Sequence, residues 1–268
     1  MAKIIAICNQ KGGVGKTTTA INLSAYLALN NKKILLIDID PQANATSGLG
    51  IDKSKVEKSI YDMLINDATI DEVIRKTDIQ NLNIVPANPA LTGAEVELVP
   101  VLSREFKLTK ALAAIRDQYD YIIIDCPPSL GLLTINALTA SDSTLIPIQC
   151  EYYALEGLSQ LMNTINLIKE NLNPKLQIEG VLLTMADYRT NLTNEVIAEA
   201  KGFFKEKVFK SIIPRNVRLS EAPSFGKPIH FYDQHSTGAL MYSQLSQEML
   251  GEKIVSSEES QNQSQIQI

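Results

Sequence analysis

A glycine-rich segment with two lysines lies near the start of the chain. Residues 10–18 read QKGGVGKTT, and the tripeptide at 15–17 matches the second half of a phosphate-binding loop. The first glycine of that pattern would fall at Gln10, and an additional lysine, Lys11, follows it. An apolar run precedes the segment and a helical pattern follows it, which is the context that the motif requires. The segment therefore predicts a nucleotide-phosphate site, and a chance Gly-Lys-Thr in an ordinary turn is the weaker interpretation.

Each residue type in this loop has a chemical reason to be there. Glycines allow backbone N–H groups to point at phosphate oxygens where a Cβ would clash, and the start of the following helix adds its positive dipole end. Lys16 would neutralise the β- and γ-phosphates, and the Thr17 hydroxyl would ligate Mg²⁺. The expected phosphate contacts are Lys11, Gly12, Gly13, Val14, Gly15, Lys16, Thr17 and Thr18.

Acidic residues follow two apolar runs. Asp125 ends the run Tyr121–Asp125 and suits a Mg²⁺ partner through water, with a turn cap before two prolines as the alternative. Asp38 and Asp40 lie on one side of another run by alternation, although an Asp-Pro pair also opens turns. Because ligands sit beyond the carboxyl ends of parallel strands, both acids are expected to face the γ-phosphate. Asp40 is expected to orient the attacking water.

These residues require a scaffold of alternating strands and helices. The expected strands are Lys3–Cys8, Lys33–Asp38, Asn83–Pro86, Tyr121–Asp125, Thr144–Ile148, Glu179–Met185 and Ser211–Ile213. The expected helices are Lys16–Leu29, Ser103–Arg116, Leu132–Leu138, Leu155–Ile168, Asn194–Phe204 and Ala239–Leu250. This alternation predicts an α/β fold with a mainly parallel twisted sheet and helices on both faces. Residues 1–254 would form a single ATPase domain, followed by a disordered polar tail at 255–268.

Composition narrows the class of protein. The chain has 268 residues, 45% hydrophobic content and a net charge of −5, which excludes a wholly basic nucleic-acid binder. Its three cysteines have no disulfide or metal spacing, so a cytoplasmic location is expected. No apolar run reaches the roughly 20 residues of a membrane span.

Five motifs together resemble the ParA/Soj family of partitioning ATPases, a P-loop NTPase group with a deviant Walker A loop. They are KGGVGKTT at 11–18, DIDPQANATSGLG at 38–50, YIIIDCPPSLG at 121–131, QCEYYALEGL at 149–158 and IPRNVRLSEAPSFGKPI at 213–229. The resemblance implies slow ATP hydrolysis with Mg²⁺ in an ATP-dependent homodimer. Lys11 would reach the partner's ATP across the interface, with Gly12 at that contact, and Pro214 and Asn216 would hold the adenine. From the residues alone, Lys11 could instead be a loop lysine that adds positive potential, and residues 214–216 could be a turn.

The resemblance also implies binding to double-stranded DNA. Residues 187–227 hold eight basic side chains against five acidic ones, and Arg189 and Arg218 match DNA-binding positions of the family. Sequence-independent phosphate contact needs such a local positive excess, although charge runs are usually solvated faces. A ParB-like partner would stimulate hydrolysis in a nucleoid-associated protein, and regulation of sporulation or replication initiation is compatible with this.

Three alternatives share the loop or its ligand. A MinD-like ATPase of division-site placement would need a basic amphipathic C-terminal helix, whereas this C-terminus is acidic and rich in Gln and Ser. Stable membrane association is therefore not expected. An iron–sulfur carrier would need suitably placed cysteines. A nucleotide-gated transcriptional regulator would be compatible with the partitioning hypothesis.

Overall fold

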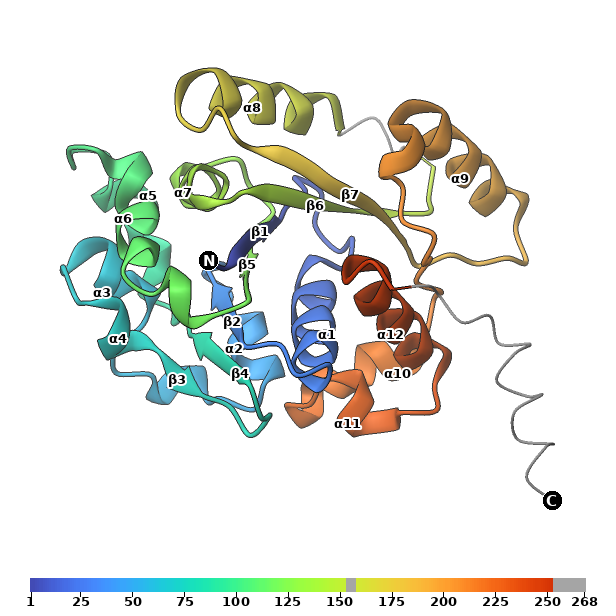
Figure 1. Ribbon diagram of the computed structural model, residues 1–268, viewed down its shortest axis with the longest axis horizontal. Coiled ribbons are helices and arrows are strands. Elements are labelled where there is room, and N and C mark those ends of the chain that lie inside the picture. Colours follow the sequence, from blue (N-terminus) through green and yellow to red (C-terminus); the bar gives the residue numbers. More distant parts are fainter. Residues whose placement is uncertain (153–157, 253–268) are drawn as a thin grey trace.

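A seven-stranded sheet organises the chain in the computed structural model, which describes residues 1–152 and 158–252 (Figure 1). The strands lie in the order β3-β4-β2-β5-β1-β6-β7. Every neighbouring pair is parallel except β3 and β4, which are antiparallel. The predicted α/β fold with a mainly parallel sheet is confirmed.

The elements alternate along the chain as the sequence predicts. The strands are β1 (Lys3–Ile7), β2 (Ile34–Asp38), β3 (Arg75–Lys76), β4 (Leu82–Val85), β5 (Tyr121–Asp125), β6 (Ser143–Gln149) and β7 (Gln177–Thr184). The α-helices of the first half are α1 (Lys16–Leu29), α2 (Asn44–Gly48), α3 (Ile60–Ile65), α4 (Ile70–Val73), α5 (Leu91–Glu97) and α6 (Lys107–Ala113). Those of the second half are α7 (Leu132–Ala140), α8 (Leu158–Asn171), α9 (Asn191–Phe204), α10 (Val217–Glu221), α11 (Ile229–Asp233) and α12 (Thr237–Met249).

Both faces of the sheet are covered, which explains the continuous apolar runs. In β1, Ile4 and Ala6 belong to one buried cluster, whereas Ile5 and Ile7 belong to the other. The first cluster includes α3 and α5 to α9, and the second includes α1, α11 and α12. Figure 1 shows α7 and α8 on one side of the sheet and α1 beside α12 on the other. Strands that are buried on both faces carry side chains that avoid water on either side.

One predicted strand is absent. Residues Ser211–Ile213 run beside β7, where the Ile213 backbone N–H donates to the Leu183 carbonyl at 2.9 Å. Isolated bridges flank the segment, of Val208 with Val181 and of Pro214 with Ala186, and the segment forms no strand. Its apolar character is explained by burial against β7. Since Pro214 has no backbone N–H, it cannot extend a ladder of hydrogen bonds.

One predicted helix is broken into shorter pieces. The range Ser103–Arg116 contains α6, which a 3-10 turn precedes. Another 3-10 turn begins at Arg116. The side chain of Asn136 on α7 donates to the Arg104 carbonyl and accepts from the Leu108 backbone N–H. A side chain from another helix therefore replaces hydrogen bonds that a continuous helix would make itself.

The remaining boundaries lie close to the predictions. Helix α1 has the predicted bounds, and the helices predicted from Asn194 and Ala239 begin at Asn191 and Thr237. The first residues of the helix predicted from Leu155 and the polar tail at 255–268 lie outside the described residues. Within the described ranges, none of the helices combines the length and apolar character that crossing a membrane would need.

Two glycines provide a matched test of this packing. Gly226 has a φ of +63°, and an added Cβ would lie 2.6 Å from the Cα of Gly50. Gly202 lies in α9, and nothing approaches an added Cβ within 4 Å. We expect Gly226→Ala to lower the free energy of unfolding by about 2–4 kcal/mol through backbone strain and overlap. Gly202→Ala should raise the free energy of unfolding by about 0.5–1 kcal/mol. Urea titrations of both variants and the wild type measure these changes. Equal effects of the two changes would contradict this packing.

Candidate functional site

The loop between β1 and α1 is anchored by side chains on both sides. Asn9 donates from Nδ2 to the Pro147 carbonyl at 2.7 Å and accepts from the Lys11 backbone N–H at 3.0 Å. The Thr184 hydroxyl, at the end of β7, donates to the Val14 carbonyl at 2.9 Å. Gly13 and Gly15 adopt left-handed φ values of +75° and +87°. The loop is therefore held in a shape that side chains with a Cβ rarely adopt.

This loop forms a cradle for an anion. Nothing lies within 4 Å of a Cβ built on Gly12 or Gly13, and the loop leads directly into the N-terminus of α1. Lys16 is buried, and its Nζ donates to the Lys11 carbonyl at 3.2 Å. Open space, a helix N-terminus and a buried ammonium group together suit phosphate oxygens. The structure thus gives the loop the features that the motif predicts for a phosphate site.

Asp125 ends β5 beside this cradle with a fully buried carboxylate. Among the described residues, neither of its oxygens has a hydrogen-bond partner of ordinary geometry, although the Thr17 hydroxyl lies close enough to lower its pKa. Burial, followed by the negative charge of Asp38, raises the pKa of Asp125 well above its ordinary value. A buried carboxylate without a partner is costly, and a divalent cation offsets that cost because it favours the charged form. Thr17 and Asp125 therefore fit Mg²⁺, which prefers such oxygen ligands.

Asp38 and Asp40 differ in how much of each carboxylate is engaged. Asp38 Oδ2 accepts from the backbone N–H and hydroxyl of Thr46 at 2.8 and 2.7 Å, and Oδ1 accepts from Asp40 N at 3.2 Å. Burial raises the pKa of Asp38 to about 6. Asp40 accepts only from Gln42 N, at 2.9 Å through Oδ1, within the described part of the chain. Asp38 thus holds the start of α2, while Asp40 keeps one oxygen for another partner.

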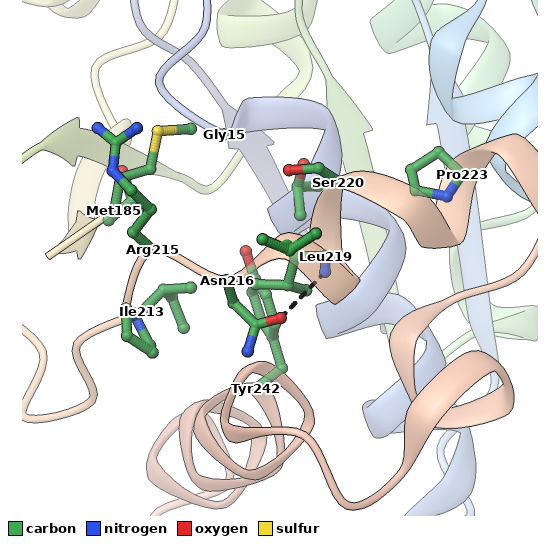
Figure 2. A pocket seen from close by; sticks show the side chains of 13 residues that line it. Gly15, Met185, Ile213, Arg215, Asn216, Leu219, Ser220, Pro223 and Tyr242 are labelled. Carbon is green, nitrogen blue, oxygen red and sulfur yellow. Dashed lines mark hydrogen bonds between the residues drawn. The ribbon is translucent and has the colours of Figure 1, made fainter. Parts of the chain in front are cut away.

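A cavity of about 410 Å³ opens beside the loop (Figure 2). Pro214 and Asn216, the residues predicted to hold the adenine, are among those that line it. Figure 2 shows Arg215 and Met185 together on one side and Ser220 and Pro223 on another. The remaining lining residues are Gly15, Thr18, Thr184, Ile213, Val217, Leu219 and Tyr242. The mixture of apolar walls and few polar groups suits a flat base.

Asn216 is already engaged within the protein. Its Oδ1 accepts from the Leu219 backbone N–H at 3.3 Å, which caps α10, and its Nδ2 donates to the Thr237 hydroxyl at 2.8 Å. Hydrogen bonds of the Asn216 amide with a base would therefore compete with the bond that caps α10 and with the bond to Thr237 on α12.

The second lysine lies outside the cradle, in an exposed ion-pair cluster. Lys11 Nζ lies 3.6 Å from Glu151 Oε2, and Arg215 Nη2 lies 3.5 Å from Glu151 Oε1. The Lys11 side chain is 41% exposed. Exposed pairs of this kind contribute little to stability, so Lys11 can leave Glu151 at small cost.

The two arginines predicted to bind DNA lie on two segments that contact each other. Arg189 follows β7 and Arg218 lies in α10. The segments meet where the Arg215 backbone N–H donates to the Ala186 carbonyl at 3.0 Å. Both arginines are exposed and both pair with carboxylates.

Several residues of the site were not predicted from the sequence. Asn9 and Thr184 anchor the loop, and Glu151 pairs with Lys11. Tyr242 lines the cavity, and its hydroxyl lies 3.1 Å from that of Thr19 on α1. Asn9 could have been suspected from its place beside the motif. Glu151 lies in the motif at 149–158, although its pairing with Lys11 has no signal in that motif. Thr184 and Tyr242 come from distant parts of the chain and have no local signal.

Known proteins share both the sequence and the fold. A family model described as an AAA domain matches residues 2–178. The sporulation initiation inhibitor protein Soj of Bacillus subtilis (strain 168) is 64% identical over 249 residues, which cover 93% of this chain and 98% of that protein. The chromosome partitioning protein ParA of Myxococcus xanthus (strain DK1622) is 59% identical over 250 residues, 93% of this chain and 88% of that protein.

Solved structures resemble it along most of their length. A Mycobacterium smegmatis protein named cobyrinic acid a,c-diamide synthase, with a bound ATP analogue and magnesium, has a TM-score of 0.82 at 35% identity. The likeness covers 93% of this chain and 95% of the Mycobacterium smegmatis chain. The septum site-determining protein MinD of Pyrococcus horikoshii OT3, complexed with Mg-ADP, has a TM-score of 0.77 at 27% identity. That likeness covers 92% of this chain and 96% of the other.

Fold, loop and carboxylates define a P-loop ATPase that uses ATP with Mg²⁺. Sequence identity with named relatives narrows this class further. The chain belongs to the ParA/Soj family of chromosome-partitioning ATPases.

Asp125→Asn tests the buried carboxylate. Folding raises the pKa of Asp125, so its charged form destabilises the nucleotide-free protein at neutral pH. We expect the variant to be more stable at pH 7 by about 1–3 kcal/mol, or roughly 2–10 °C in Tm. The difference should vanish near pH 4, where an unfolded aspartate also binds its proton, at about 3.9. Calorimetry from pH 4 to 8 measures it.

The same variant should lose most of the stabilisation that Mg-ATP confers on the wild type, because the ligand then binds more weakly to the folded state. Asp78→Asn, at an exposed position, is the control and should change neither property. An Asp125→Asn protein that is less stable than wild type at pH 7 would contradict our account.

Proposed function

We propose that this ATPase is an ATP-gated dimer that binds double-stranded DNA without base specificity and acts in chromosome partitioning. The relatives named for chromosome partitioning support the cellular role. The observation that best supports an ATP-gated dimer is that the two lysines of the loop lie in different environments. Lys16 is buried inside the cradle, whereas Lys11 is exposed at its rim.

Within one copy, the residues of the cradle bind and orient the nucleotide. Lys16 and the backbone N–H groups of residues 12–17 neutralise the phosphates, and the cavity beside Pro214 and Asn216 holds the adenine. Thr17 and Asp125 would hold Mg²⁺, which supplies charge neutralisation at the β- and γ-phosphates. Asp40 has the free carboxylate oxygen that can accept a hydrogen bond from the attacking water.

Lys11 then acts on the nucleotide of a second copy. Its ammonium group is too exposed to belong to the closed cradle, and its only ion pair in the described ranges is the exposed one with Glu151. A cation supplied from a partner stabilises the charge that develops in phosphoryl transfer, as arginine fingers do. Gly12 is exposed and leaves room for a close approach of the partner. ATP thereby becomes part of the dimer interface, and hydrolysis weakens that interface.

DNA binding follows from joining two weak surfaces. Residues 187–227 carry a local excess of positive charge, although the chain as a whole has a net charge of −5. Contacts of Arg189 and Arg218 with phosphates would give binding without base readout. Because a dimer presents two such surfaces, avidity makes the DNA affinity depend on ATP. A ParB-like partner would accelerate hydrolysis and so release the protein from the nucleoid, and any effect on sporulation or replication initiation would use this same switch.

Substitution of each lysine should block a different step, ATP binding for Lys16 and dimerisation for Lys11. Lys16→Ala should lose binding of a fluorescent ATP analogue, whereas Lys11→Ala should bind it within about threefold of wild type. Lys11→Ala should nevertheless remain monomeric with Mg-ATP in analytical ultracentrifugation. Lys110→Ala, which removes an exposed lysine from α6, should behave like wild type in both assays. A Lys11→Ala protein that forms the ATP-dependent dimer normally would refute the role of this residue in the partner's site.

Asp40 tests the link between hydrolysis and release from DNA. Asp40→Ala should lower ATP turnover about 10²-fold or more, because the attacking water loses its acceptor. The variant should stay longer on a random-sequence duplex with Mg-ATP, which surface plasmon resonance measures. Anionic vesicles in parallel reactions distinguish a MinD-like protein, since our proposal expects co-sedimentation with DNA and none with vesicles. Unchanged turnover together with unchanged DNA residence would show that Asp40 has no such role.

A further inference from the structure

Carboxylates of the chain itself hold both arginines that are predicted to contact DNA. Arg189 forms a two-pronged pair with Asp187, with Nε at 2.8 Å from Oδ1 and Nη2 at 2.6 Å from Oδ2. This pair lowers the pKa of Asp187 to about 2. The arginine side chain is 86% exposed, so it remains within reach of a ligand.

Arg218 is held in a similar way from two directions. Its Nη1 lies 3.0 Å from Glu221 Oε2, and its Nε lies 3.4 Å from Asp233 Oδ2. The Tyr232 hydroxyl donates to the same oxygen of Glu221 at 2.9 Å and fixes its position. The Arg218 side chain is 55% exposed.

The lysines of the same region have no such partners. Within the described ranges, no ion pair involves the exposed side chains of Lys201, Lys205, Lys207, Lys210 and Lys227. Two exposed glutamates of α9, Glu195 and Glu199, are also unpaired there. Acidic groups two or three residues away along the chain thus pair with the two arginines, whereas the five lysines have no ion-pair partner among the described residues. Arg215 adds to this arrangement, since its charge also lowers the pKa of Asp187.

We propose that Asp187 and Glu221 compete with DNA phosphate for Arg189 and Arg218, and thereby keep the DNA affinity of a single copy low. This inference rests on the proposed DNA-binding function and concerns its regulation. A phosphate that takes the Nε and Nη2 donors of Arg189 must displace the carboxylate of Asp187, which then faces the DNA as an unpaired negative charge. A monomer gains little from this exchange, whereas a dimer makes it twice on one duplex and adds its unpaired lysines. The carboxylates therefore keep the affinity of a single copy low, so that DNA binding at a given concentration requires the two joined surfaces of a dimer.

The expected effect follows from the strength of exposed pairs. Such a pair changes an equilibrium by up to about fivefold, so removal of one competitor should tighten DNA binding by roughly three- to fivefold per copy. In a dimer the effect counts twice, which gives about tenfold or more. The logarithmic salt dependence should also steepen by up to about 0.9 per copy, because one more phosphate contact acts without an opposing charge.

Asp187→Asn and Glu221→Gln, separately and together, test the competition. Asparagine retains the Oδ1 acceptor for the Arg189 backbone N–H, so the turn is preserved. Glu195→Gln, Glu199→Gln and their double variant remove the same charge from the same region without touching an arginine. Fluorescence anisotropy with a random-sequence duplex, at 50 to 200 mM salt, is measured with Mg-ATP and without nucleotide, and ultracentrifugation confirms the monomer.

We expect the Asp187→Asn, Glu221→Gln double variant to bind the duplex without nucleotide as a monomer, and the Glu195→Gln, Glu199→Gln variant to need ATP as wild type does. Equal affinities and salt slopes of these two double variants would overturn the competition, while binding of wild type with Mg-ATP would leave the proposed function intact. If wild type with Mg-ATP binds no DNA, the proposed function itself fails. Should Asp187→Asn fold poorly, the DNA affinities of Glu221→Gln and Glu199→Gln are compared instead. Tighter binding by Glu221→Gln alone supports the competition, and equal affinities overturn it.

Discussion

The buried carboxylate of Asp125 imposes the central constraint on this fold. It ends β5 at the same level as Asp38 on β2, so two fully buried acids lie side by side. Hydrogen bonds from Thr46 and Asp40 satisfy Asp38, but Asp125 receives no comparable donors from the described residues. The surrounding sheet must be stable enough to hold an acid in this costly environment. The same cost makes the position suited to a metal ion, since a cation relieves it.

Charges in this protein differ in function according to their depth. Lys16, Asp38 and Asp125 are buried, and their environments fix each of them in one place. Lys11, Glu151 and Arg215 form an exposed cluster at the rim of the same loop, where ion pairs exchange at small cost. Buried charges suit chemistry that needs a rigid geometry, whereas exposed ones suit contacts that must form and break. One short loop contains both kinds because its glycines bring the backbone, and with it Lys11, to the surface.

The proposed DNA surface uses the same principle of replaceable pairs. Arg189 and Arg218 are exposed, and each is already paired with carboxylates of the chain. A surface of unpaired arginines would bind any polyanion, whereas paired ones bind only where several contacts form together. Weak individual contacts also allow rapid release when a dimer separates. The net charge of −5 is consistent with this arrangement, because it limits non-specific attraction outside the basic region.

The sequence by itself determined the class of fold and the identity of the phosphate loop. Continuous apolar runs predicted strands that are buried on both faces, and motifs with local spacing predicted Lys16, Thr17 and Asp125 as site residues. The sequence did not reveal the break at Asn136, because a side chain from α7 makes it, nor the isolated bridges at Pro214. The sequence predicted that Asp38 and Asp40 lie on one side of a strand, but it did not reveal that Thr46 binds the carboxylate of Asp38 alone.

Tertiary structure alone decided which charges meet. Glu151 reaches Lys11 from the end of β6, Thr184 anchors the loop from β7, and Tyr242 approaches Thr19 from α12. The pair of Arg218 with Asp233 depends on how α10 and α11 fold against each other, whereas its pair with Glu221 lies within α10. Hydrophobic periodicity and loop motifs act over a few residues and can be read along the chain. The long-range partner of a charge, such as Glu151 for Lys11, depends instead on which distant segments the packed sheet brings within about 4 Å, the range at which ion pairs form.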